Sequence, residues 1–138
     1  MQKEFNFRTI GELFLTPKNQ KALLLHYDTH DVFVLQIHGK KRWKLYNADY
    51  KTPVLNSVQP IFQREQLNGE RDIAVSVEEM RYIPRSVPHE GFTSDESSLH
   101  LTIGVYPTQW MDLLTKAIHH LAHSQLELRQ SLPLGFFK

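Results

Sequence analysis

The sequence predicts a mainly β domain of the sandwich or barrel type, followed by one helical segment. Between residues 12 and 106 the apolar residues fall into short stretches, several of which alternate apolar and polar positions. Turn-forming residues separate these stretches, and the region is interrupted by prolines at positions 53, 60, 84, 88 and 107. After Pro107 the apolar period lengthens to three or four residues, which is typical of an amphipathic helix. Many short strands with turn signals favour a sandwich or barrel.

Six short stretches are predicted to be strands. In chain order they are ELFLT (12–16), DVFVLQIHG (31–39), KRWKLY (41–46), DIAVSV (72–77), MRYIP (80–84) and SLHLTIGVY (98–106). The turn at His38, Gly39 and Lys40 favours a hairpin between the second and third strands. In the third strand the alternation places Lys41 on the same face as Trp43. Residues 47–70 are polar and irregular.

The C-terminal segment predicts a helix and an apolar tail. The helical face is formed by Trp110, Leu113, Leu114, Ala117, Ile118 and Leu121. Pro133 ends any helical run, and the tail carries Leu132, Leu134, Phe136 and Phe137. We therefore expect a β-barrel over residues 1–107 and a helical segment with its tail over residues 108–138. So much apolar surface on a small chain predicts self-association, as a homodimer formed through the helix and tail. The alternative is that the tail folds back on the barrel of the same chain.

Composition excludes several classes of function. Sixteen basic and fifteen acidic residues nearly cancel over 138 residues, so we expect no nucleic-acid partner and no membrane partner. The chain has no cysteine, which rules out disulfides and thiolate metal sites, so any metal must be held by nitrogen and oxygen. The first ten residues contain no apolar run, and no stretch is long enough to span a bilayer. A cytoplasmic protein is the expectation.

The cluster HYDTHD at residues 26–31 contains candidate metal ligands. His26 and Asp28 stand two residues apart, and on an extended strand their side chains share one face. Imidazole and carboxylate together suit a divalent cation such as Fe(II). His89, after two prolines that stiffen its loop, is the best candidate for a third ligand. Spacing alone does not choose between His26 and His30, or between Asp28 and Asp31, and such residues also cap loops or lie on solvated surfaces.

A second pair of histidines stands at helical spacing. His119 and His123 are four residues apart, as in helical two-histidine sites. Position 120 is a histidine and not the glutamate of the zinc-protease motif. A solvated helix face is the preferred interpretation of this pair.

Three motifs, taken in order, resemble the JmjC-type cupin oxygenases related to the ribosomal oxygenases. They are HYDTHDVFVLQIHGKKRW, YIPRSVPHEG and SLHLTIGVY, and the resemblance extends over about residues 12–133. It implies a double-stranded β-helix, the jelly-roll or cupin barrel. It also implies an Fe(II)- and 2-oxoglutarate-dependent dioxygenase that hydroxylates an amino-acid side chain of a protein or peptide, with ribosomal proteins among the candidates.

The same resemblance assigns roles to individual residues. It places His26, Asp28 and His89 on the iron ligands and leaves His30 and Asp31 as non-ligands. Lys41 matches the basic residue that binds the distal carboxylate of 2-oxoglutarate, whose charge needs a buried cation. The last motif places His100 and Thr102 on one strand face, as co-substrate contacts. For His100, a satisfied core histidine is an equal alternative.

The chain departs from the family pattern at several positions. The family has proline where this chain has Leu25, glycine where it has Ser86, and often asparagine where it has Glu12. A carboxylate at Glu12 repels 2-oxoglutarate unless it is turned away or protonated. Family members also carry a much longer segment before the first ligand than the 25 residues present here. Three alternatives follow: a metal-binding cupin that is non-catalytic or catalyses another reaction, a fragment of a larger JmjC-type oxygenase, and a structural interaction module.

Overall fold

The computed structural model describes residues 7–47, 52–54 and 62–136. Two of the features noted in the sequence, Pro60 and Phe137, lie outside these residues, as does much of the polar region after residue 47. The chain divides into two compact units, one ending at Pro107 and the other beginning at Thr108.

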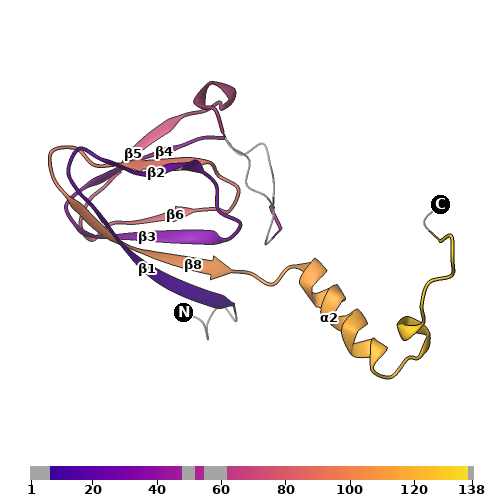
Figure 1. Ribbon diagram of the computed structural model, residues 1–138. Coiled ribbons are helices and arrows are strands. Elements are labelled where there is room, and N and C mark those ends of the chain that lie inside the picture. The colour runs from indigo at the N-terminus through magenta and orange to yellow at the C-terminus, as the bar shows by residue number, and fades with distance from the viewer. Residues whose placement is uncertain (1–6, 48–51, 55–61, 137–138) are drawn as a thin grey trace. The chain divides into compact units, whose positions relative to one another are not determined.

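The first unit is built from two antiparallel sheets, which confirms the predicted mainly β fold (Figure 1). One sheet contains, in spatial order, β1 (Arg8–Thr16), β8 (Ser98–Tyr106), β3 (Asp31–His38) and β6 (Met80–Ile83). The other contains β2 (Lys21–His26), β7 (His89–Phe92), β4 (Lys41–Leu45) and β5 (Arg71–Val75). A short 3₁₀ turn, η1 (Arg64–Gln66), precedes β5. Successive strands alternate between the sheets over much of the chain, so distant segments meet across the barrel.

All six predicted strands are present, with bounds within a few residues of those expected. The two strands that the sequence pattern did not predict, β2 and β7, are those that contain His26 and His89. The expectation that His26 and Asp28 share a strand was wrong for Asp28. β2 ends at His26, and the carbonyl of Asp28 accepts a hydrogen bond from the Ser86 amide at 2.9 Å, so a loop contact holds this residue.

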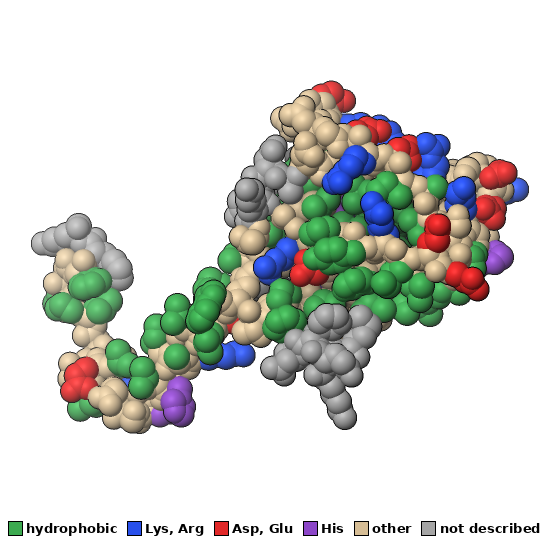
Figure 2. Space-filling view, turned by 180° about the vertical axis from the view of Figure 1, so that it is seen from behind, with side chains coloured by type: hydrophobic (Ala, Val, Ile, Leu, Met, Phe, Trp, Pro, Cys, Tyr) green, Lys and Arg blue, Asp and Glu red, His purple; other side chains and the backbone are tan. Residues whose placement is uncertain are grey.

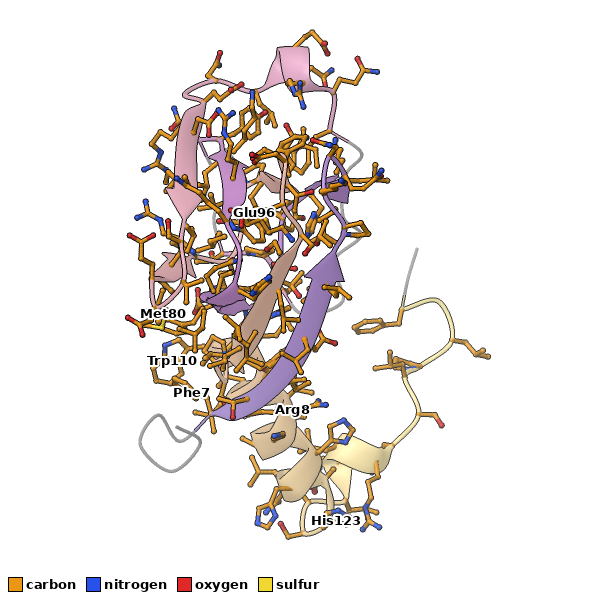
Figure 3. All side chains as sticks on the ribbon, turned by 90° about the vertical axis from the view of Figure 1, so that its left-hand side faces the viewer. Phe7, Arg8, Met80, Glu96, Trp110 and His123 are labelled. Carbon is orange, nitrogen blue, oxygen red and sulfur yellow. The ribbon has the colours of Figure 1, made fainter. Side chains whose placement is uncertain are left out.

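The apolar core lies between the two sheets. Its buried members are Val32, Val34, Trp43, Leu45, Val75 and Ile83. The burial pattern of β4 shows the predicted alternation, because Lys41, Trp43 and Leu45 are buried while Arg42 is exposed. Burying such side chains stabilises the fold by roughly 1.5–3 kcal/mol each. Figure 3 shows the side chains that fill the space between the sheets.

The β3–β4 hairpin depends on Gly39. Its φ of 64° lies in the left-handed region, and a Cβ at this position would stand 2.0 Å from the carbonyl oxygen of Ser97. Only glycine fits such an approach. This turn places Lys41 at the start of β4, with its side chain inside the barrel.

The second unit begins with α2 (Trp110–Ala122) and continues into a 3₁₀ turn, η2 (Glu127–Arg129). A capping box between Gln109 and Asp112 satisfies the amides at the start of the helix. Every residue of α2 is described, and none of them is buried. Hydrophobic side chains cover much of the face of this unit seen in Figure 2. Among the described residues, no helix has the length and apolar character needed to cross a membrane.

Candidate metal centre

His26, Asp28 and His89 come together at one end of the barrel. Each offers a ligand atom, and these atoms lie within 4.8 Å of one another. The pairing of β2 with β7 produces this proximity, since His26 and His89 are direct partners in the antiparallel register. The Asp28 carboxylate lies 3.9 Å from Nε2 of His26 and 3.6 Å from Nε2 of His89. Among the described residues, these are the only three grouped in this way.

Backbone carbonyls fix the tautomer of both histidines. Nδ1 of His26 lies 2.6 Å from the carbonyl oxygen of Leu24, and Nδ1 of His89 lies 2.9 Å from that of Val87. A carbonyl oxygen only accepts hydrogen bonds, so Nδ1 carries the proton in the neutral form of each ring. The lone pair is then on Nε2, which faces Asp28. This arrangement is typical of metal-binding histidines.

Burial keeps His89 neutral. Desolvation lowers its pKa, and the neighbouring His26 lowers it further, outweighing the opposite effect of Asp28. A neutral imidazole is the form that binds a metal. The chemistry of the donor set, two neutral imidazoles and a carboxylate, therefore fits a divalent transition metal.

The other half of the HYDTHD cluster has structural contacts. Asp31 accepts hydrogen bonds from the Tyr82 hydroxyl at 3.1 Å and the Arg85 amide at 3.0 Å, and so holds the loop before His89. His30 stacks on Tyr106 with ring centroids 4.3 Å apart. Neither residue belongs to the group of three, although His30 lines the adjacent cavity.

A cavity of about 120 Å³ opens beside the triad. Its lining includes all three residues of the group together with His30, Trp43, Glu12 and Thr102. Thr102 and Glu12 are partners in the register of β8 and β1, which brings them to the same place on the sheet. Of the predicted co-substrate residues, Thr102 lines this cavity, while Lys41 and His100 lie buried in the barrel.

Lys41 is a fully buried cation. Its Nζ lies 3.1 Å from Oγ1 of Thr16 and 3.5 Å from Nδ1 of His100, and above the ring of Trp43. Among the described residues it has no carboxylate partner, and burial lowers its pKa to about 8. Gly91 provides the room for this side chain, since a Cβ there would stand 2.9 Å from Cε of Lys41. A buried amine without a counter-ion fits an anionic ligand.

His100 completes a polar region in the barrel interior. Burial, followed by the charge of Lys41, lowers its pKa to about 4, so the ring is neutral. Its Nδ1 accepts from Lys41, and its Nε2 is a buried donor without a partner among the described residues. Nε1 of Trp43 and Oε1 of Gln36 are likewise buried without partners there. Such a concentration of unpartnered polar atoms is typical of a ligand site and rare in a dry core.

Glu90 is a residue of this region that sequence reasoning missed. Its buried carboxylate accepts from Tyr46 at 2.8 Å and from Arg64 at 2.5 Å, and lies 2.7 Å from Lys21 of β2. Burial raises the pKa of Glu90, but these three donors lower it by more, so the net shift is downward. The network ties β2 to β7, the strands of the two triad histidines. A carboxylate directly after a candidate ligand was the only sequence signal for it.

A family described as the JmjC domain matches residues 1–113 of the chain. A Culex quinquefasciatus protein named bifunctional lysine-specific demethylase and histidyl-hydroxylase NO66 is 36% identical, over 96% of this chain and 22% of its own length. Ribosomal oxygenase 1 of Danio rerio is 31% identical, over 100% of this chain and 27% of its own length. The chain thus spans about a quarter of the length of these relatives.

Solved structures show the same fold. The Escherichia coli ribosomal oxygenase YcfD superimposes with a TM-score of 0.63 at 19% identity, over 93% of this chain and 33% of its own. An RmlC-like cupin with a double-stranded β-helix from Methanocaldococcus jannaschii gives a TM-score of 0.50 at 10% identity, over 70% of this chain and 69% of its own. The jelly-roll fold predicted from the sequence is therefore confirmed.

Proposed function

Because the chain belongs to the JmjC domain family, we propose that it is the catalytic barrel of an Fe(II)- and 2-oxoglutarate-dependent dioxygenase. The reaction is hydroxylation of an amino-acid side chain of a protein or peptide. The observation that carries the proposal is the convergence of His26, Asp28 and His89 beside a cavity, with both Nε2 atoms directed at the carboxylate.

The three residues would hold Fe(II) through Nε2 of each histidine and the carboxylate of Asp28. With 2-oxoglutarate and dioxygen, the bound iron would supply the oxidising power for hydroxylation. The protein contributes position and a dry environment. The carbonyls of Leu24 and Val87 keep both rings in the binding tautomer, and the Glu90 network holds their strands together.

Lys41 would bind the distal carboxylate of 2-oxoglutarate. It is protonated at neutral pH, buried, and without a carboxylate partner among the described residues. Thr16 and His100 orient its amine, and the unpartnered Nε2–H of His100 can donate to the same ligand. Thr102, from the cavity wall, is a further co-substrate contact. A structure of YcfD with cobalt and succinic acid is among those that share the fold, at a TM-score of 0.55.

The names of the relatives support the proposed substrate class. NO66 proteins are named lysine-specific demethylases and histidyl-hydroxylases, and others are named ribosomal oxygenases. A protein side chain is therefore the proposed substrate here, with ribosomal proteins as the first to test.

Two alternatives remain in the same fold. A cupin that binds metal without oxygenase activity is one, since an RmlC-like cupin shares the barrel and Glu12 departs from the JmjC pattern. The other is that the chain is part of a larger oxygenase, consistent with its matching about a quarter of its relatives. A part of a larger oxygenase is compatible with the proposed chemistry, whereas a cupin without oxygenase activity is not.

The experiment that tests the proposal begins with anaerobic titration of Fe(II) into the metal-free protein, followed by 2-oxoglutarate. Oxygen is then admitted with and without candidate ribosomal peptides, and succinate is measured. We expect one Fe(II) per chain and succinate release stimulated by a peptide that gains one oxygen atom. Stoichiometric iron binding without any succinate would favour the non-catalytic cupin.

We also propose a homodimer formed through the C-terminal unit. The apolar side chains of α2 are largely exposed, as Leu114 and Ile118 illustrate at 58% each. The tail adds Leu132 at 56% and Phe136 at 60%. Exposed apolar surface of this kind is typical of a protein–protein interface.

A further inference from the structure

Glu12 places a carboxylate at the cavity that the proposed chemistry does not use. It stands on β1 opposite Thr102 of β8, and both line the cavity beside the triad. Phe14, two residues further along the same face, stacks on His100 with ring centroids 5.2 Å apart. Alternation thus directs Glu12 to the inner side of the sheet, while its exposure leaves it within reach of a ligand from solvent.

The Glu12 carboxylate has no hydrogen bond or ion pair with any other described residue. The nearby cation, Arg8, stands 5.6 Å from the ring centroid of Tyr106. The pKa of Tyr106 is raised, first by its burial and then by the negative charge of Glu12, which agrees with a carboxylate facing this part of the cavity. Glu12 is therefore available to bind a ligand.

The barrel interior and its cavity contain a positive and a negative side chain that are not paired with each other. Lys41 is a buried cation without a carboxylate partner in the described part of the chain, and Glu12 is an anion without a cation. Metal binding would offset the charge of Asp28, which leaves Glu12 as the remaining negative group of the cavity lining. An anionic co-substrate is attracted to Lys41 and repelled by Glu12.

We propose that Glu12 is a specificity-determining residue that binds a cationic side chain of the substrate, a guanidinium or an ammonium group. This inference rests on the proposed function, which assigns the anionic co-substrate to Lys41. A carboxylate accepts two parallel hydrogen bonds from a guanidinium, so a guanidinium is the preferred partner. Glutamine at this position would keep the shape and lose the charge.

The test uses two probes of nearly equal shape, n-butylguanidinium and its neutral analogue n-butylurea. Their dissociation constants are measured by NMR titration with Mn(II) bound, where paramagnetic broadening reports that a probe lies near the metal. Because Glu12 is exposed, we expect the wild-type protein to prefer the cation by about two- to fivefold, as for solvent-accessible ion pairs. The preference should grow at low ionic strength.

Glu12→Gln should reduce this preference to about one, with the affinity for n-butylurea unchanged. The matched control is Glu65→Gln, an exposed glutamate of η1 that should leave the preference intact. Thermal unfolding checks that each variant is folded, and Glu12→Asp, which retains the charge, should retain the preference. Equal binding of the two probes by the wild-type protein, or an unchanged preference in Glu12→Gln, would overturn the inference.

Failure of this inference is distinguishable from failure of the proposed function. If Mn(II) does not bind, the metal site is wrong, and the probes are then compared by chemical-shift titration of the metal-free protein. A preference lost in Glu12→Gln under those conditions still supports cation binding by Glu12. If Mn(II) binds and the preference is absent, only the role of Glu12 is rejected.

Discussion

At the scale of single residues, Lys41 combines a cost in stability with a proposed role in co-substrate binding. Its pKa falls from 10.5 to about 8 because the charged amine is buried. At about 1.4 kcal/mol per unit, keeping it protonated costs the metal-free fold about 3 kcal/mol at neutral pH. Lys41→Met should therefore raise the free energy of unfolding at pH 7 by about 1–3 kcal/mol, measured by chemical denaturation. The same change should strongly weaken 2-oxoglutarate binding, measured by calorimetry, and spare metal affinity.

The control for this substitution is Lys44→Met. Lys44 is paired with Glu70 at the surface of β4, so its loss should alter neither quantity appreciably. If Lys41→Met left 2-oxoglutarate affinity unchanged, the co-substrate role would pass to another cation, with Arg85 next to be tested.

The lowered pKa of Lys41 also predicts a pH dependence. Between about pH 8 and 10.5 the unfolded chain binds this proton and the folded protein does not. The Lys41 contribution to the free energy of unfolding therefore rises with pH across that interval, and below it the full cost of the buried charge remains. Affinity for 2-oxoglutarate has the opposite trend and should fall above about pH 8, as the amine loses its charge. Calorimetry from pH 6.5 to 9.5 should show this fall in the wild-type protein and not in Lys41→Met.

The proposed metal ligands are tested by comparing three alanine variants. His26→Ala and Asp28→Ala should each abolish tight binding of Fe(II) or Mn(II), because each removes one of three donors. His30→Ala should retain binding, since His30 stacks on Tyr106 outside the triad. Electron paramagnetic resonance of Mn(II) measures the bound fraction. Loss of binding in His30→Ala alone would show that the wrong histidine was assigned.

At the scale of elements, the turn before β7 contains a strained residue. Ser86 has a φ of 73° and its amide donates to the carbonyl of Asp28, so the turn holds the loop of this proposed ligand in place. The left-handed conformation costs a non-glycine residue roughly 1–2 kcal/mol, and glycine avoids this cost. The greater conformational entropy of glycine in the unfolded chain cancels part of that gain. Ser86→Gly should therefore stabilise the protein by about 0.5–1 kcal/mol, measured by thermal denaturation. Ser86→Ala, which keeps the strain, should have little effect; stabilisation by alanine as well would reject this explanation.

How far the elements could be predicted depends on their pattern. β3, β4 and β8 alternate clearly and were found with nearly correct bounds. β2 has the sequence KALLLH, in which three consecutive leucines hide any period of two. β7 is HEGF, four residues containing glycine and glutamate, which are both unfavourable in strands. Their strand conformation comes from pairing with each other and with β4, and such tertiary contacts are invisible to a local pattern.

The candidate site also divides into a part that the sequence predicts and a part that depends on tertiary contacts. Residue types and motifs in the sequence suffice to nominate His26, Asp28, His89 and Lys41. The contacts that orient these side chains could be found only from the fold, because the contacts join segments far apart in the chain. His100 reaches Lys41 from 59 positions away, and the Glu90 network depends on Lys21 and Arg64.

At the scale of the whole molecule, the proposed dimer would bury apolar side chains of the second unit. The exposed apolar residues of α2 and the tail would supply several kcal/mol if buried, at ~25 cal/mol per Å², before the entropic cost of association. A symmetric dimer covers the same patch on two copies at once.

We therefore expect the protein to be a dimer at micromolar concentration in light scattering, and the double substitution Leu114→Lys and Ile118→Lys to make it monomeric. Lys116→Ala, on the polar side of the same helix, should leave the dimer intact. Removal of residues 131–138 should lower the thermal unfolding temperature and weaken association, since it removes Leu132, Leu134 and Phe136 from the interface. If the full chain is monomeric and its unfolding temperature is unchanged by that removal, neither α2 nor the tail forms an interface. Metal affinity provides the last comparison: the triad lies in the first unit, so the monomeric variant should bind Mn(II) as tightly as the wild-type protein.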